Sequence, residues 1–214
     1  QEGVFAKAGS IVDATIVQVP RQRNSRKENA EIKAGQIPKE WKNDAHKLSH
    51  KDTDARWLKK NGENFFGYKD HIKTDAGTVL ITDYRVTAAS VHDSVVLSEM
   101  LGEGDNGQSL HADSAYKSHE CDEMLCSKKI ENQIHEKGNR GTALTQTQLE
   151  HNRQKSKIRA LVEHVFGFME NSMNGIFMRC IGIKRARCHI GLANLTYNIF
   201  RYAQLIRLNR VQRA

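Results

Sequence analysis

The sequence predicts an α/β fold in which a mixed β-sheet is flanked by helices, with a basic insertion after the first strand. Three observations support this fold class. Residues 11–19 are apolar on both sides and rich in β-branched side chains, which is typical of a buried central strand. Residues 65–73 and 79–87 are two further strand-like runs joined by a turn. Residues 145–171 show the apolar spacing of a long helix.

One acidic residue, Asp13, interrupts the first predicted strand. Because burying an unpaired charge is very costly, a carboxylate in such a strand requires a strong partner. A metal ion or a basic side chain would meet that requirement. Asp13 is therefore the first candidate site residue.

Residues 21–64 differ in composition from the strand that precedes them and contain twelve Lys and Arg against seven Asp and Glu. We expect a surface insertion with at most short helices, one of them over residues 46–60. Arg21 and Arg23 follow the strand that carries Asp13, so their positive charge falls near any site there. A solvated loop and a specific contact with DNA are equally good interpretations of these arginines.

The chain after the insertion alternates between strands and helices. The two runs within residues 65–87 predict a β-hairpin, and a helix over residues 91–101 follows it. A short strand, a helix over residues 118–130 and an edge strand over residues 132–135 come next. This order is consistent with one domain built around a single sheet.

Asp113 ends the short strand and has only small residues beside it. Small neighbours leave room for a ligand to approach the carboxylate. In α/β folds, binding sites commonly lie where a strand ends. Asp113 is therefore the second candidate site residue.

The long helix carries a third acid next to its apolar stripe. Arg159 and Glu163 lie one helical turn apart beside that stripe. They form either a surface ion pair that contributes a few tenths of a kcal/mol, or part of a site in which Glu163 joins Asp13 and Asp113. The stripe comprises Ile158, Leu161, Val162, Val165 and Met169.

The net charge of +8 arises at the end of the chain, because no Asp or Glu follows Glu170 whereas eight Lys and Arg do. Residues 172–214 therefore form a basic and partly helical segment. Clustered cations are what a polyanion-binding protein needs for contacts with phosphate. Lys184, Arg185 and Arg187 are candidate DNA contacts, and a solvated helix end is the alternative.

A second helical pattern lies within this basic segment. Its apolar residues recur at three-and-four spacing, so we expect them to pack on the domain. Arg201 and Arg207 would then point outward. The apolar residues are Leu192, Leu195, Ile199, Tyr202 and Ile206.

Two classes of protein are excluded by the composition. The chain has no run of 18 apolar residues and no signal-peptide pattern, so we expect a soluble cytoplasmic protein with no membrane partner. The four cysteines fit no close pair of CxxC motifs, which favours reduced thiols over a zinc site.

The three acids together predict a metal site. The expected element order lets Asp13 and Asp113 lie side by side at the centre of the sheet, while the long helix brings Glu163 across from them. Converging carboxylates need a cation in order to stay ionised, and two divalent ions about 4 Å apart would neutralise them and activate water. Ligands that are all oxygen suit magnesium or manganese.

Eight short motifs, in this order, resemble those of the DDE transposases of bacterial insertion sequences, specifically the insertion-sequence-five group. The resemblance covers nearly the whole chain and implies an RNase H-like catalytic domain over residues 1–214. It also implies that Asp13, Asp113 and Glu163 are the catalytic and metal-binding triad, with two Mg²⁺ ions that Mn²⁺ can replace. The motifs lie at residues 12–15, 19–24, 66–69, 86–93, 112–116, 162–167, 181–182 and 191–195.

The resemblance further implies an activity on double-stranded DNA. The bound ions would activate water to nick DNA at the ends of the element, and would then align the freed 3′-hydroxyl for attack on target DNA. A homo-oligomer on DNA, associated with the bacterial nucleoid, would carry this out. Arg159 matches a basic residue of the family that would contact the DNA backbone or steady Glu163.

Two departures from the family pattern keep alternatives open. Glu170 stands where family members often have Lys, and the amino-terminal DNA-binding region is missing, so we expect the C-terminal catalytic portion of a transposase. A catalytically inactive or truncated DNA-binding remnant is one alternative. A host nuclease of the same fold is the other.

Overall fold

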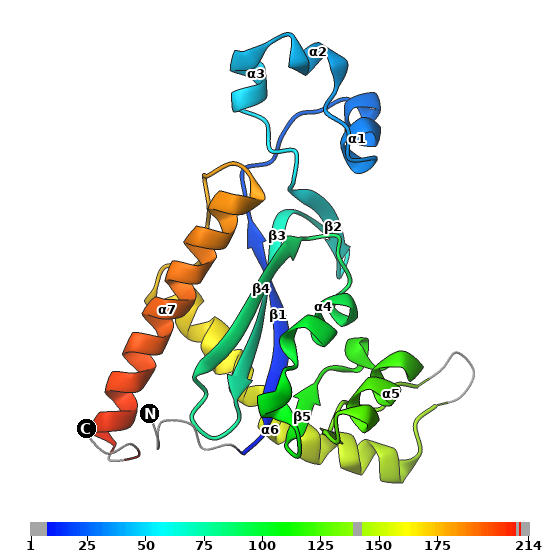
Figure 1. Ribbon diagram of the computed structural model, residues 1–214, viewed down its shortest axis with the longest axis vertical. Coiled ribbons are helices and arrows are strands. Elements are labelled where there is room, and N and C mark those ends of the chain that lie inside the picture. The colour runs from blue at the N-terminus through cyan, green and yellow to red at the C-terminus, as the bar shows by residue number, and fades with distance from the viewer. Residues whose placement is uncertain (1–7, 139–142, 209, 211–214) are drawn as a thin grey trace.

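A six-stranded mixed β-sheet forms the centre of the computed structural model, which describes residues 8–138, 143–208 and 210 (Figure 1). The strands are β1 (Ser10–Gln18), β2 (Arg56–Lys60), β3 (Glu63–Asp75), β4 (Ile81–Ala88), β5 (Ser109–Ala112) and β6 (Glu131–Asn132). Their order is β2-β3-β1-β5-β6, and β4 also pairs with β3. β1 runs antiparallel to β3 and parallel to β5, so the predicted mixed sheet is confirmed.

Helices cover both faces of this sheet. The helices are α1 (Arg26–Lys33), α2 (Lys39–Lys42), α3 (Ala45–Ser49), α4 (Asp93–Met100), α5 (His119–Ser127), α6 (Gln146–Ser172) and α7 (Ile183–Arg207), with short 3₁₀ turns at Glu103–Asp105 and Ser114–Tyr116. Successive residues of a strand point to opposite faces. Val12 accordingly packs in a core with residues of α4 and α5, whereas Ile11 packs with α6 and α7.

The long periodic segments have the predicted structure. β1 is buried or half-buried up to its last residue, and β3 and β4 form the expected hairpin. The carboxylate of Asp75 accepts hydrogen bonds from the backbone N–H groups of Gly77 and Thr78 and so stabilises the connecting turn. The predicted long helix is α6, in which Thr145 is the N-cap and forms a capping box with Gln148.

The insertion differs from the prediction in its second half. A short helix, α3, ends at Ser49, and β2 then pairs with β3 where a helix over residues 46–60 was expected. The buried side chain of Trp41 organises the preceding helices, and its Nε1 donates a 2.6 Å hydrogen bond to Glu28. Contacts between residues distant in sequence thus determine the secondary structure of this region, and the spacing of apolar residues does not reveal those contacts. In Figure 1 α1 to α3 stand beyond one end of the sheet.

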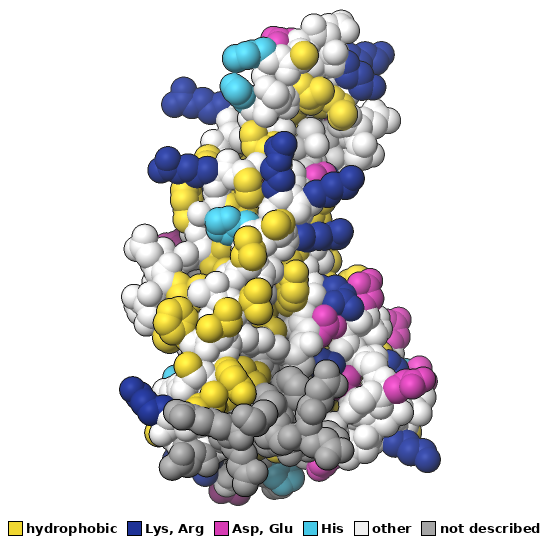
Figure 2. Space-filling view, turned by 60° about the vertical axis from the view of Figure 1, so that its left-hand side comes forward, with side chains coloured by type: hydrophobic (Ala, Val, Ile, Leu, Met, Phe, Trp, Pro, Cys, Tyr) yellow, Lys and Arg dark blue, Asp and Glu magenta, His cyan; other side chains and the backbone are white. Residues whose placement is uncertain are grey.

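The prediction for the packed face of α7 was wrong. Leu192 and Ile199 are 59% and 61% exposed, and Leu195 and Tyr202 are exposed as well. Figure 2 shows a band of hydrophobic side chains down this face of the molecule. Arg201, which was expected to point outward, donates from Nε to the carbonyl oxygen of Thr78 at 2.7 Å. The buried residues of α7 are Ala186, Ile190, Asn194, Tyr197 and Leu205.

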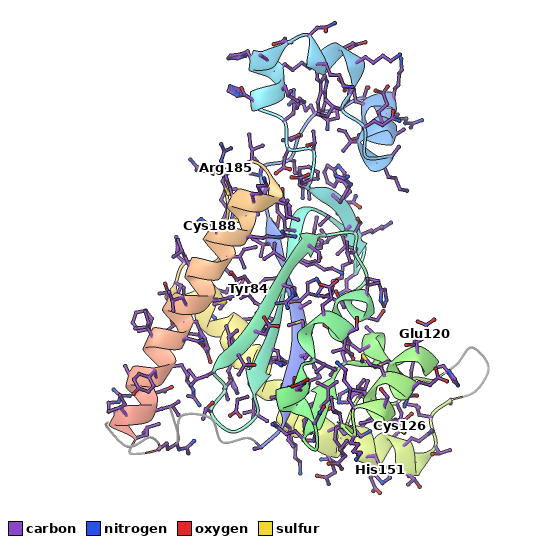
Figure 3. All side chains as sticks on the ribbon, viewed as in Figure 1. Tyr84, Glu120, Cys126, His151, Arg185 and Cys188 are labelled. Atoms are coloured by element: carbon purple, nitrogen blue, oxygen red, sulfur yellow. The ribbon has the colours of Figure 1, made fainter. Side chains whose placement is uncertain are left out.

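Polar groups explain which face of α7 packs on the sheet. The amide of Asn198 accepts a hydrogen bond from the backbone N–H of Ile81 and donates one to its carbonyl oxygen, both at 2.8 Å. These bonds satisfy backbone groups at the start of β4. Gly191 permits close approach, because a Cβ atom there would collide with the hydroxyl of Tyr84, which lies on β4 (Figure 3). Hydrophobic spacing alone does not detect such contacts.

The described part of the chain contains no helix with the length and apolar character needed to cross a membrane. The predicted edge strand is shorter than expected and comprises only Glu131 and Asn132. Of the eight basic residues after Glu170, Arg213 lies outside the described residues.

Candidate active site

Asp13 and Asp113 lie on neighbouring strands. β1 and β5 are parallel, and Val12 on β1 pairs with Ala112 on β5. Asp13 and Asp113 are the residues that directly follow this pair, one on each chain segment. Figure 1 shows β1 and β5 side by side. The structure thus brings the first two sequence-predicted acids together.

Asp13 is a partly buried carboxylate with defined partners. Its Oδ1 accepts a 2.8 Å hydrogen bond from the backbone N–H of Ala14, and its Oδ2 accepts a 3.0 Å bond from Nη1 of Arg159. Burial raises the pKa of Asp13 above its ordinary value of 3.8, while Ala14 and Arg159 lower it. The charges of Asp113 and Asp93 raise it further, which means that several acids share one region.

Glu163 reaches this region through Arg159. Nη2 of Arg159 donates to Oε1 of Glu163 at 2.6 Å, so one guanidinium group bridges Glu163 and Asp13. The side chain of Glu163 is 57% exposed, whereas those of Arg159 and Asp13 are 22% and 20% exposed. The ion pair predicted as one alternative is present, and it includes the first-strand acid. Val162 and Val165 are fully buried on the adjoining side of α6 and fix this helix against the sheet.

The surroundings of Asp113 are compact. Its carboxylate accepts a 2.6 Å hydrogen bond from the backbone N–H of Ser114 at the start of a 3₁₀ turn. Tyr116 at the end of that turn is buried in the core beside α4 and α5. Burial raises the pKa of Tyr116, and the nearby charges of Asp93, Asp13 and Asp113 raise it further.

Asp93 is a fourth acid of this region, and the sequence did not single it out. Its Oδ1 accepts a 2.8 Å hydrogen bond from Nζ of Lys69 and lies 3.8 Å from Nδ1 of His71. Burial lowers the pKa of His71 to about 4, although Asp93 opposes this shift. Lys69 and His71 are two positions apart on β3, and polar residues on one face of a buried strand are the signal that could have pointed to Asp93.

The ligand types of this site suit a hard divalent cation. Asp13, Asp113 and Glu163 offer only carboxylate oxygens, which magnesium and manganese prefer. No group of three or more His, Cys, Asp or Glu is arranged to hold a metal ion within the described residues. In this conformation Glu163 is bound to Arg159. The donor set therefore fits the ion in chemistry, with Asp13 and Asp113 already adjacent.

The predicted DNA-binding residues other than Arg159 lie away from the acids. Arg21 and Arg23 are exposed beyond the end of β1, and Arg21 stacks over Trp57 with its Cζ 6.0 Å from the ring centroid. The end of β1 lies five residues after Asp13, a separation of about 17 Å. Arg21 and Arg23 therefore lie beyond the end of β1 and away from Asp13.

The basic start of α7 adjoins the insertion. Backbone N–H groups of Gly182 and Ile183 donate to the carboxylates of Asp52 and Asp54 at 3.1 and 2.9 Å. Figure 3 shows Arg185 at this end of α7, near the insertion. The exposed Lys and Arg residues here are Lys184, Arg185 and Arg187.

Comparison with known proteins identifies the family. The family described as "Transposase DDE domain" matches residues 5–199. The chain belongs to this family. Membership agrees with the motif resemblance, whereas the finer assignment to the insertion-sequence-five group stays a prediction.

One curated relative and one solved structure extend the comparison for this DDE transposase domain. The chain is 29% identical over 196 residues to the transposase for insertion sequence element IS1106 of Neisseria meningitidis serogroup B. This alignment covers 92% of the chain and 65% of that relative. The chain thus spans about two thirds of the length of this relative. The cryo-EM structure of the piggyBac transposase synaptic complex with hairpin DNA superposes with a TM-score of 0.52 at 10% identity, covering 96% of this chain and 49% of the other. That likeness concerns the fold and agrees with the predicted RNase H-like architecture.

Proposed function

We propose that this domain catalyses metal-dependent cleavage of DNA at transposon ends and transfer of the cleaved strand into target DNA. Membership of the transposase family makes DNA the expected substrate. The observation that carries the proposal is the meeting of Asp13 and Asp113 on paired strands, with Arg159 linking Asp13 to Glu163. An arrangement required only for folding would not gather acids at the centre of a sheet.

Asp13, Asp113 and Glu163 would hold two Mg²⁺ ions, for which Mn²⁺ can substitute. Two such ions, when bound, neutralise charge on the phosphate and lower the pKa of water. The backbone N–H groups of Ala14 and Ser114 each bind one oxygen of the adjacent carboxylate and so orient Asp13 and Asp113. Each carboxylate is therefore preorganised by the peptide group that follows it before any ion arrives.

The reaction would proceed in two displacements at phosphorus. In the first, a water oxygen forms a bond to phosphorus, the bond from phosphorus to the 3′ oxygen breaks, and that oxygen takes a proton. In the second, the 3′-hydroxyl attacks a target phosphate and displaces the target 3′ oxygen. The role of Asp13, Asp113 and Glu163 is to bind and orient the groups that exchange at phosphorus.

DNA would also contact basic side chains at a distance from the reacting phosphate. Arg21, Arg23 and the cluster at the start of α7 are exposed and lie toward one end of the molecule. Two DNA ends have to be brought together in transposition, so we propose that a homo-oligomer acts on DNA at the bacterial nucleoid. Arg159 would bind backbone phosphate or position Glu163.

One observation favours the alternative of a catalytically inactive remnant. Glu170 is exposed and lies seven residues after Glu163, hence two turns away on the same face of α6. A carboxylate there repels phosphate where the family often has Lys. A host nuclease of the same fold would cleave DNA regardless of terminal inverted repeats.

Nicking of supercoiled plasmid in Mg²⁺ or Mn²⁺ tests the proposal. We expect Asp13→Asn, Asp113→Asn and Glu163→Gln each to reduce nicking at least 100-fold, because each removes one charged ligand of the proposed ions. Glu150→Gln, an exposed change on the same helix, should leave the rate unaltered. Full activity in all three site variants would exclude the assignment. Salt-sensitive DNA binding without nicking by the unaltered protein would favour the remnant.

A further inference from the structure

Arg159 makes a contact that an isolated surface ion pair would not make. Its two terminal nitrogens bind carboxylates from different elements, Asp13 on β1 and Glu163 on α6, at 3.0 and 2.6 Å. The partner on β1 is 146 positions away in the sequence. Nε of Arg159 is buried and has no hydrogen-bond partner in the part of the chain that the structure describes.

This bridge engages Asp13, one of the three carboxylates of the proposed metal site. Oδ1 of Asp13 accepts from Ala14, and Oδ2 accepts from Arg159, so both oxygens already carry a hydrogen bond. A guanidinium group at hydrogen-bond distance also repels an incoming divalent cation. An ion that binds Asp13 and Glu163 must therefore displace Arg159 or bind against its charge.

Folding alone does not account for the bridge. α6 is already fixed to the sheet by Val162, Val165 and Met169, which are buried against Ile11 and Ile72. The ion pair between Arg159 and Glu163 adds little to stability, because the carboxylate of Glu163 is exposed and solvent screens the pair. The charge of Arg159 has a clearer effect on the acids themselves, which would otherwise repel one another.

We propose that Arg159 is an exchangeable counter-ion that holds Asp13 and Glu163 in the metal-free domain and competes with divalent cations for them. This inference rests on the proposed function, because it requires that the two acids belong to a metal site. Arg159 is thus a positioning residue whose release accompanies metal binding. The same planar fork that binds two carboxylates can bind phosphate once it is released.

Binding of Mn²⁺ to the full chain without DNA, measured by calorimetry and by electron paramagnetic resonance of the free ion, tests this competition. We expect Arg159→Gln to bind Mn²⁺ about tenfold more tightly than the unaltered protein, since one neighbouring charge shifts carboxylate equilibria by about that factor. Arg153→Gln is the matched control, with the same charge loss at an exposed position on the same helix, and should leave the affinity unchanged.

The outcomes separate this inference from the proposed function. Equal Mn²⁺ affinity in Arg159→Gln and the unaltered protein, with binding lost in Asp13→Asn, overturns the competition and leaves the metal site standing. An absence of Mn²⁺ binding in every variant overturns both. Equal gains in Arg159→Gln and Arg153→Gln also contradict the inference, because they would reflect net charge alone.

A second variant keeps the test decisive if Arg159→Gln fails to fold, which circular dichroism would reveal. Arg159→Lys retains the charge, but an ammonium group is a point donor that cannot span both carboxylates as the planar fork does. We expect its Mn²⁺ affinity to rise by a smaller factor, about threefold. An unchanged affinity in a folded Arg159→Lys variant would count against the bridge as the competing group.

Discussion

Asp70 is a carboxylic acid held inside the sheet beside an amide side chain. It is fully buried on β3, and its Oδ1 accepts a 3.2 Å hydrogen bond from Nδ2 of Asn194 on α7. Among the described residues, Oδ2 of Asp70 and Oδ1 of Asn194 have no hydrogen-bond partner. Burial raises the pKa of Asp70 to about 7, and the bond from Asn194 only partly opposes this. When Asp70 is protonated, its O–H group is a hydrogen-bond donor close to Oδ1 of Asn194, which has no other donor among the described residues.

This buried acid predicts a pH-dependent stability. The folded-state pKa near 7 exceeds the ordinary value of 3.8, so the unfolded chain loses its proton first as pH rises. The contribution of Asp70 is therefore fully present below about pH 4 and is lost progressively up to about pH 7. Urea denaturation should show Asp70→Asn to be more stable than the unaltered protein at pH 8, by on the order of a few kcal/mol. At pH 4 the difference should be small.

Glu150→Gln supplies the background for that measurement, because its side chain is exposed and other groups titrate over the same range. If Asp70→Asn and Glu150→Gln show the same change in stability between pH 4 and pH 8, the buried acid is not the source. Loss of stability in Asp70→Asn at pH 8 would mean that the charged form is favoured in the folded protein.

The candidate site was foreseeable in part at the level of single residues. Asp13 and Asp113 stand out because each interrupts or ends an apolar strand, where a carboxylate needs a special reason. Asp93 lies in the first turn of α4, a position that acids favour anyway, so its residue type alone does not mark it as a site residue. Its contacts with Lys69 and His71 depend on how α4 meets β3, and the polar residues of β3 indicate only that a partner is needed there, not which residue supplies it.

At the scale of elements, α7 has two apolar faces and packs with only one of them. Asn194, Tyr197 and Asn198 lie on the inward face and bind groups of the sheet, so hydrogen bonding outweighs apolar area in selecting it. Strongly periodic elements such as β1 and α6 were predictable because one face or both are continuously apolar. The structure of the insertion was not predictable in this way, because its short helices are organised around one buried side chain, that of Trp41.

Matched substitutions on α7 test which face is buried. Leu205 is 1% exposed and Leu195 is 55% exposed. We expect Leu205→Ala to lower the free energy of unfolding by about 2 to 4 kcal/mol because it leaves a cavity. Leu195→Ala should change it by less than about 0.5 kcal/mol, since the side chain is already in water. Chemical denaturation of both variants gives the comparison, and a larger loss at Leu195 would reverse the assigned orientation.

At the scale of the whole molecule, the clustered Lys and Arg residues and the acids of the candidate site lie in different parts of the structure. The acids of the candidate site lie where β1, β5 and α6 meet, whereas exposed Lys and Arg gather around the insertion and the start of α7. Figure 2 shows Lys and Arg along the upper part of one face and acidic side chains toward its lower right. The sequence places the charge excess after Glu170, but only the fold brings it beside the insertion, through Asp52 and Asp54. A long nucleic acid could therefore contact this basic end while a phosphate reaches the acids.

This segregation predicts how DNA affinity depends on salt. Each phosphate contact releases counter-ions and adds about 0.9 to the slope of log affinity against log salt concentration for duplex DNA. Replacing Arg185 and Arg187 together by Ala should therefore lower that slope by about 1.8 and weaken binding of any duplex sequence. Fluorescence anisotropy with a labelled duplex between about 50 and 200 mM salt covers the informative range.

The matched control removes the same charge elsewhere. Lys129 and Lys137 are exposed near α5, and their double replacement by Ala should leave the slope nearly unchanged if binding is confined to the basic end. Equal slope reductions in the two double variants would mean that net charge, and not the position of the cluster, governs binding. A lower affinity with an unaltered slope in the Arg185 and Arg187 variant would indicate that these side chains support the structure of α7 and do not contact phosphate.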